Sequence, residues 1–140
     1  MTRLAGFLAR WGPALAIMTA IFVASATPGD ELPDAGEWDP LLKKGGHLLG
    51  YALLGAAYLR GLARGRRPSA RDLGAAVLLA ALYAVSDELH QGQTPGRTPA
   101  VADVGIDVVG SALGAGGRGW WAGRKRGAVA PLPAGPTGRT

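Results

Sequence analysis

Four apolar segments alternate with polar segments along the chain. They cover residues 11–26, about 45–63, 73–86 and about 104–121, and the first and third contain no charged residue. A membrane-spanning helix needs about 20 apolar residues and tolerates about 17. The four segments lie at or near that limit once their polar ends are included. The pattern therefore predicts an all-α integral membrane bundle of four transmembrane helices.

Basic residues are distributed unequally between the segments that connect these helices. If the N-terminus is cytoplasmic, every Lys and Arg except Lys43, Lys44 and Arg97 falls on the cytoplasmic side. This asymmetry agrees with the positive-inside rule. The first outer connection, residues 27–44, is rich in acidic residues instead. We expect a multi-pass protein of the cytoplasmic membrane with both termini in the cytoplasm.

The first apolar segment and the bundle each allow another interpretation. Arg3 and Arg10 precede that segment, and Ala24-Ser25-Ala26 resembles the cleavage site of a secretory signal peptide. A soluble four-helix bundle would need polar stripes along its helices, and residues 73–86 carry no charge. Three further apolar segments and the alternation of charge favour an uncleaved anchor and a membrane bundle.

Composition narrows the class of protein further. The 140 residues include 23 Gly and no Cys, which excludes disulfides and thiolate metal sites. Small residues let helices approach closely within a membrane. The net charge of +5 is spread over short segments rather than one folded face, so we expect no nucleic-acid partner. We predict a membrane domain at 1–121 and a disordered, basic, Pro/Gly-rich cytoplasmic tail at 122–140.

Polar residues recur where the second, third and fourth apolar segments begin or end. Their spacings of three, four or seven residues place them on one face of each helix. Ionisable groups at the edge of the hydrocarbon tend to face the bundle interior and pair with one another. Arg97, which follows a Thr-Pro-Gly turn, is expected to fold back onto the carboxylates. The predicted binding residues are Lys44, His47, Tyr51, Asp87, Glu88, Gln91, Arg97, Asp103 and Asp107.

Plainer roles remain open for most of these residues. Asp87 and Glu88 could cap the end of the third helix, although carboxylates oppose the dipole at a helix C-terminus. Tyr51 could be an interfacial anchor and His47 an ordinary interfacial histidine. Asp107 lies about one turn inside the fourth segment, where a carboxylate must pair or keep its proton. Proton-coupled transport through Asp107 is therefore one functional possibility. We rank it below the binding and enzymatic functions described below.

Four short motifs occur in order between the apolar segments, over about Ile21 to Gly114. On these motifs the chain resembles the VanZ-like family of small bacterial membrane proteins. It departs from the family pattern at Lys43, where an acidic residue is frequent, and at Asp107, where Asn is usual. The motifs are Ser25-Ala26-Thr27-Pro28-Gly29, Lys44-Gly45-Gly46-His47 with Tyr51, Asp87-Glu88-Leu89-His90-Gln91, and Pro95-Gly96-Arg97 with Asp103 and Gly110.

The resemblance implies a four-helix membrane domain of the bacterial cell envelope with an outward-facing polar site. It also implies a link to resistance to the glycopeptide antibiotic teicoplanin. We favour a binding protein whose partner is a membrane lipid headgroup, a lipid-linked cell-wall precursor or a glycopeptide.

The alternative is a membrane-embedded enzyme that acts on a lipid-linked substrate by general acid/base catalysis. Its candidate catalytic residues are His47, Asp87, Glu88 and Arg97. His47 with Asp87, Glu88 and Asp103 could bind a metal ion, but no ligand spacing of the HExxH type occurs. We therefore expect neither a metal nor a cofactor.

Overall fold

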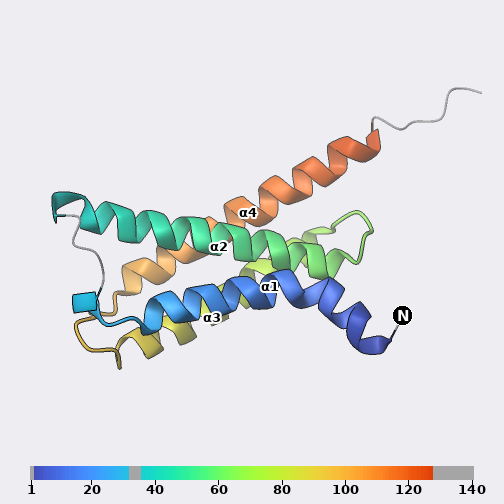
Figure 1. Cartoon of the computed structure of the whole chain (residues 1–140). Helices are drawn as coiled ribbons and strands as arrows, with labels where there is room; N and C mark the ends of the chain where they lie inside the picture. The colour runs from blue at the N-terminus through green and yellow to red at the C-terminus, as the bar shows by residue number, and fades with distance from the viewer. Residues whose placement is uncertain (1, 32–35, 128–140) are drawn as a thin grey trace, which may run out of the picture.

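The computed structural model describes residues 2–31 and 36–127 and contains four long helices that lie side by side (Figure 1). No strand occurs among the described residues, so the all-helical prediction is confirmed. Two short 3-10 turns, η1 (Gly29–Glu31) and η2 (Gly36–Trp38), lie between the first two helices. The helices are α1 (Arg3–Ala26), α2 (Asp39–Ala63), α3 (Ala70–Gln91) and α4 (Val101–Gly127).

Each helix extends beyond the apolar segment that predicted it, because local capping signals lie outside the apolar residues. α2 starts at Asp39 with Pro40 in its first turn, where the missing proline N–H costs no helical hydrogen bond. α3 starts after Ser69, which forms a reciprocal capping box with Asp72. α4 runs on to Gly127, past the predicted start of the tail at residue 122. Residues 128–140 of that tail lie outside the described residues.

Glycines bring α2 and α4 into close contact. A Cβ built on Gly114 would overlap the backbone carbonyl of Ala52, and one on Gly110 would meet that of Leu48. Gly55 of α2 lies equally close to the backbone of Ser111. Gly110 and Gly114 form a GxxxG pattern, which allows the backbones of membrane helices to touch. Small side chains thus set the separation of the central helix pair.

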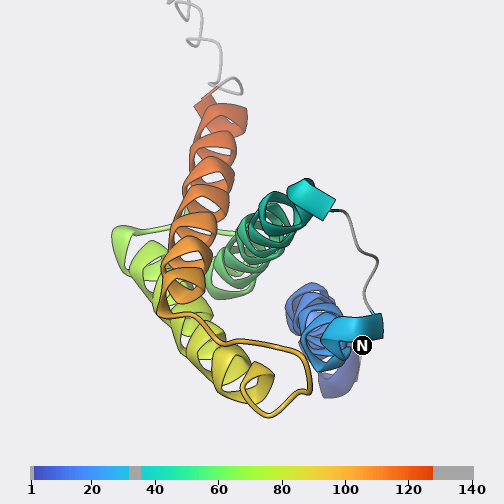
Figure 2. The ribbon, with the colours of Figure 1, turned by 90° about the vertical axis from the view of Figure 1, so that its left-hand side faces the viewer.

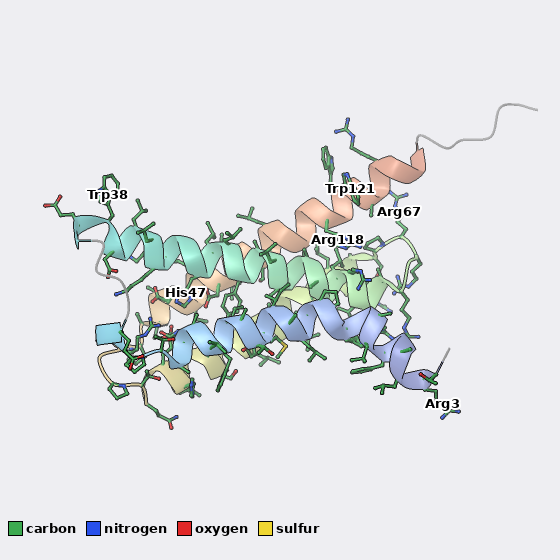
Figure 3. All side chains as sticks on the ribbon, in the orientation of Figure 1. Arg3, Trp38, His47, Arg67, Arg118 and Trp121 are labelled. Atoms are coloured by element: carbon green, nitrogen blue, oxygen red, sulfur yellow. The ribbon has the colours of Figure 1, made fainter. Side chains whose placement is uncertain are left out.

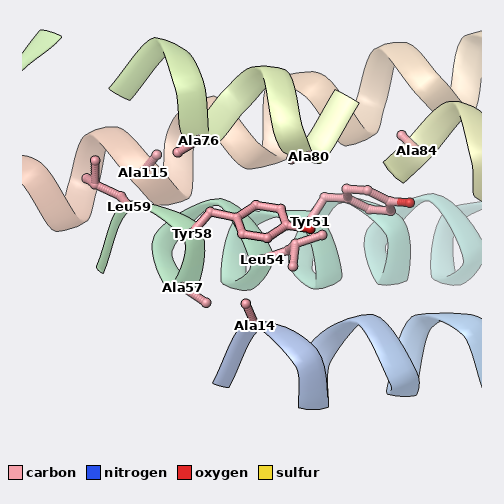
Figure 4. Packing of buried hydrophobic residues seen from close by; sticks show 10 residues of the cluster. All are labelled: Ala14, Tyr51, Leu54, Ala57, Tyr58, Leu59, Ala76, Ala80, Ala84 and Ala115. Atoms are coloured by element: carbon pink, nitrogen blue, oxygen red, sulfur yellow. The ribbon is translucent and has the colours of Figure 1, made fainter. Parts of the chain in front are cut away.

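The buried core is small and lies around α2, which contacts each of the other three helices (Figure 2). Tyr51, Leu54 and Leu59 of α2 are almost fully buried. They pack with a row of alanines from the other helices, which Figure 4 shows together with Tyr58 and Ala57. The alanines are Ala14, Ala76, Ala80, Ala84 and Ala115.

Large apolar side chains point outward rather than inward. On α3, Leu78, Leu82 and Leu89 share one exposed face. Such a face would be costly in water but is ordinary against lipid. Among the described residues, α1 and α3 are long and apolar enough to cross a membrane, with mean hydropathies of 1.6 and 1.3 over their best windows. α2 and α4 do not meet that criterion, because polar residues interrupt them.

α1 is attached to α2 by a basic side chain. Pro13 lies within α1 and has no N–H to bond the carbonyl four residues earlier. That carbonyl, on Ala9, accepts a hydrogen bond of 3.0 Å from Nη1 of Arg60, which also donates to the Arg10 carbonyl. Arg60 therefore stabilises the backbone of α1 at the point where proline weakens it.

The two ends of the bundle differ in charge. Arg3, Arg67 and Arg118 lie at the end where the α2–α3 connection and the start of α1 are found (Figure 3). His47 lies toward the opposite end, near the α1–α2 and α3–α4 connections. The segregation seen along the chain is thus a segregation in space.

Candidate functional site

The site lies at the end of the bundle opposite the arginines and is assembled from all four helices. The connection between α1 and α2 docks there against the connection between α3 and α4. The N–H of Gly29 in the first donates to the carbonyl of Pro95 in the second over 3.0 Å. A Cβ on Gly29 would overlap the carbonyl of Gly96, which itself has a positive φ of 70°. Glycine is needed at both positions. This contact places the α3–α4 connection against the end of α1.

A buried polar network joins α1 to α3. The Ser25 hydroxyl donates to Oδ2 of Asp87 over 2.9 Å. The amide nitrogen of Gln91 donates to Ser25 Oγ over 3.1 Å and to Asp87 Oδ2 over 3.2 Å. All three side chains are buried. Asp87 therefore does not cap the solvent end of its helix; its carboxylate is held inside the bundle.

Ser25 is absent from the residues predicted for the site, although it belongs to the first motif. Besides that motif, its sequence signal was its position at the end of the first apolar segment, which also fitted a signal-peptide cleavage site. A serine needs a partner when it is buried. That partner, Asp87, is 62 residues away in the chain, too far for a spacing argument.

His47 and Asp107 form a second pair, between α2 and α4. Nδ1 of His47 lies 3.1 Å from Oδ1 of Asp107, whose side chain is only 1% exposed. The structure therefore supplies the partner that Asp107 requires. The ring of Tyr51 stacks on that of His47 with centroids 6.5 Å apart. Tyr51 is 1% exposed, so its role as an interfacial anchor is ruled out.

Glu88 holds the start of α4. Its Oε2 accepts a 2.7 Å hydrogen bond from the backbone N–H of Ala100, the residue before the helix. Its Oε1 is buried and has no hydrogen-bond partner among the described residues. Glu88 also lies close to His47 and Asp103. Each of the three offers one potential ligand atom, and these atoms lie within 4.8 Å of one another. Three of the residues predicted for the site are thus brought together from three helices.

Arg97 does not bind the carboxylates as expected. Its Nε donates to the carbonyl of Thr27 over 3.2 Å, and its Nη2 donates to the carbonyl of Ala24. The last carbonyls of a helix have no partner within the helix, and a cation there is favoured by the helix dipole. The end of α1 therefore competes successfully for Arg97, because the docked connections place the guanidinium beside it.

A cavity of about 200 Å³ opens between α1 and α2 at this end. Polar groups on its wall come from the network around Ser25 and from the two basic residues Lys43 and Arg97. Lys43 also forms an ion pair of 2.5 Å with Asp39. Lys44, the lysine predicted for the site, is exposed and does not line the cavity. The main polar lining residues are Ser25, Lys43, His47, Tyr51, Gln91 and Arg97.

Comparison with known proteins places the chain in a family. No curated protein and no solved structure matches it. A family model described as VanZ/LLP1 matches residues 11–119. The match includes all four helix centres and every residue of the site described above, and it confirms the resemblance drawn from the motifs. The chain therefore belongs to the VanZ/LLP1 family.

Proposed function

We propose that this chain is a four-span protein of the bacterial cytoplasmic membrane that binds an anionic headgroup at its outer face. The ligand is the headgroup of a membrane lipid or of a lipid-linked cell-wall precursor. The observation that carries the proposal is the cavity between α1 and α2, where Lys43 and Arg97 meet the hydroxyl, amide and imidazole groups of its wall.

The proposed topology follows from the two ends of the bundle. The arginine-rich end, with Arg3, Arg67 and Arg118, would face the cytoplasm by the positive-inside rule. The cavity would then open at the outer surface. Removal of the first helix after Ala26 would separate Ser25 from its buried partner Asp87. The network therefore supports retention of α1 as an anchor.

The wall of the cavity matches a phosphate on an apolar chain. Arg97 uses two of its nitrogen atoms on the end of α1 and retains further N–H donors. Guanidinium groups bind phosphate and carboxylate well. Ile21, Leu42 and Gly50 supply an apolar part of the same wall, which suits the first carbons of a lipid tail.

A direct test is lipid retention by the purified protein in detergent, measured by native mass spectrometry with phosphatidylglycerol and phosphatidylcholine as probes. We expect selective retention of phosphatidylglycerol. Lys43→Gln and Arg97→Ala should each weaken it about tenfold, the equivalent of ~1.4 kcal/mol. Arg67→Ala, which removes the same charge from the other end, is the control. Equal retention of both lipids would contradict the proposal, and so would a loss of phosphatidylglycerol retention with Arg67→Ala.

We extend the proposal to teicoplanin, because binding of a wall precursor would alter access of a glycopeptide to its target. Expression of the chain in a sensitive bacterium should raise the inhibitory concentration of teicoplanin. Lys43→Gln and Arg97→Ala should abolish the increase at equal membrane abundance, and Arg67→Ala should keep it. If the wild-type chain leaves the inhibitory concentration of teicoplanin unchanged, the link to resistance is contradicted. The lipid measurement still tests headgroup binding.

A second candidate is a membrane-embedded enzyme, favoured by the His47–Asp107 pair. A buried carboxylate that orients an imidazole is a common arrangement for a general base. Asp107→Asn separates the two candidates, because Asp107 contacts His47 but does not line the cavity. In an enzyme it should abolish resistance while phosphatidylglycerol retention is unchanged, whereas in a binding protein the two properties should change together.

A further inference from the structure

We propose that His47, Glu88 and Asp103 bind a divalent first-row transition metal ion between α2, α3 and α4. The site adjoins the headgroup cavity, because His47 lines that cavity whereas Glu88 and Asp103 do not. It does not depend on the function proposed above.

The geometry of the three side chains suits a metal ion. One potential ligand atom from each residue lies within 4.8 Å of the other two. Tetrahedral bonds of about 2.0–2.2 Å to zinc place two ligand atoms roughly 3.5 Å apart. Closing the site therefore needs side-chain movements of about 1 Å. A catalytic metal site usually has three protein ligands and leaves a coordination position for water or substrate.

His47 is already oriented for ligation. Its Nδ1 lies 3.1 Å from Oδ1 of Asp107, and an ionised carboxylate can only accept a hydrogen bond. With Asp107 ionised and the imidazole neutral, Nδ1 would donate to Asp107 and Nε2 would keep a lone pair for the metal. Metal-binding histidines almost always donate their other ring N–H to such a partner. Asp107 would thus act as a positioning residue for His47.

The buried charge at this end favours a cation. Glu88 is 7% exposed, and its Oε1 has no hydrogen-bond partner among the described residues. One oxygen of Asp107 and one of Asp87 are unpartnered in the same part of the chain. Burying a carboxylate oxygen without a partner is costly. Arg97 does not neutralise these groups, since its hydrogen bonds go to α1.

The ligand types indicate which metal would bind. Imidazole suits zinc, iron and other transition ions, whereas magnesium and calcium prefer sites made of oxygen ligands only. Carboxylates are also good ligands for manganese. We therefore choose Zn²⁺ and Mn²⁺ as the probes.

The experiment uses the full chain in detergent without a polyhistidine tag. Zn²⁺ binding is measured by equilibrium dialysis, and we expect one ion per chain. Glu88→Gln and Asp103→Asn should each weaken binding at least about tenfold, and Asp107→Asn should weaken it by a similar factor through His47. His90→Asn is the matched control, because it removes the only other histidine, which stacks on Phe22 outside the cluster.

A second measurement does not depend on the variants folding. With Mn²⁺ bound to the wild-type chain, pulsed electron paramagnetic resonance should detect coupling between the ion and an imidazole nitrogen. Added Zn²⁺ should displace the Mn²⁺ and remove this coupling. Absence of saturable Zn²⁺ binding to the wild-type chain would overturn the proposal. So would a nitrogen coupling that disappears with His90→Asn, or Zn²⁺ affinity unchanged in folded Glu88→Gln and Asp103→Asn.

Discussion

At the scale of single residues, the site depends on polar side chains that are buried and share partners. Ser25, Asp87 and Gln91 form hydrogen bonds with one another across two helices. In a low-dielectric interior, such a network is stabilising only while its members remain paired. The hydroxyl of Ser25 is central, because it donates to Asp87 and accepts from Gln91.

Ser25→Ala should therefore lower the stability of the folded chain by about 1–3 kcal/mol, because Asp87 and Gln91 each lose a buried partner. Thermal unfolding in detergent, followed by circular dichroism, measures the change. Ser86→Ala is the control, since Ser86 is exposed and bonds only within its own helix turn. Its effect should stay within about 0.5 kcal/mol. Equal effects from the two substitutions would show that the network adds no stability.

Arg97 shows how a correct residue can be assigned the wrong partner. The sequence indicates a guanidinium near several carboxylates, and electrostatics alone favours an ion pair. The chain instead places Arg97 against the free carbonyls at the end of α1. The docking of Gly29 against Gly96 decides this, and that contact joins residues far apart in the chain.

At the scale of helices, close backbone packing replaces large side chains in the core. α2 and α4 approach through Gly55, Gly110 and Gly114. Lipid surrounds an apolar helix as favourably as another apolar helix does, so association must come from packing and polar contacts. The same approach brings His47 of α2 to Asp107 of α4. Helix packing and assembly of the site therefore depend on each other.

Gly114→Ala should destabilise the bundle by about 1–3 kcal/mol, because the added methyl group would overlap the Ala52 carbonyl and push the helices apart. Gly116→Ala is the matched control on the same helix, where nothing lies within 4 Å of an added Cβ. It should be neutral or stabilising by up to about 1 kcal/mol. Thermal unfolding of both variants measures the difference. A Gly114→Ala protein as stable as Gly116→Ala would refute the close packing of α2 and α4.

At the scale of the whole molecule, charge is divided between the ends of the bundle. Arg3, Arg67 and Arg118 lie at one end (Figure 3), and His47, which lies near Glu88 and Asp103, lies toward the other. This division predicts both the orientation in the membrane and the face on which a ligand would arrive. The exposed apolar side chains of α3 agree with the proposal that the bundle lies in a membrane.

The orientation can be measured directly, because the chain contains no cysteine. Thr98→Cys, in the α3–α4 connection, should react with a membrane-impermeant maleimide in intact cells. Arg67→Cys, in the α2–α3 connection, should react only after permeabilisation. Both positions are exposed, so access depends on the side of the membrane. The reverse pattern would place the cavity in the cytoplasm and contradict the proposed outer site.

Much of the architecture could be predicted because its signals are local. Helix number and approximate centres follow from four apolar runs, and the family follows from four motifs in order. The helix starts were missed by several residues, since capping by Ser69 or by Pro40 lies outside the apolar pattern. Within the predicted site, His47, Asp87, Glu88 and Asp107 do converge. Lys44 does not line the cavity, and Lys43 does.

By itself, the sequence determined that the chain forms four helices, which segments they occupy, how charge is divided, and which family it belongs to. These properties depend on residue type and on spacings within one helix. Only the tertiary structure decided that Ser25 joins Asp87, that Arg97 binds the end of α1, and that His47 is the partner of Asp107. Those partners are set by how closely the helices and their connections pack, a property of backbone contacts between residues distant in the chain.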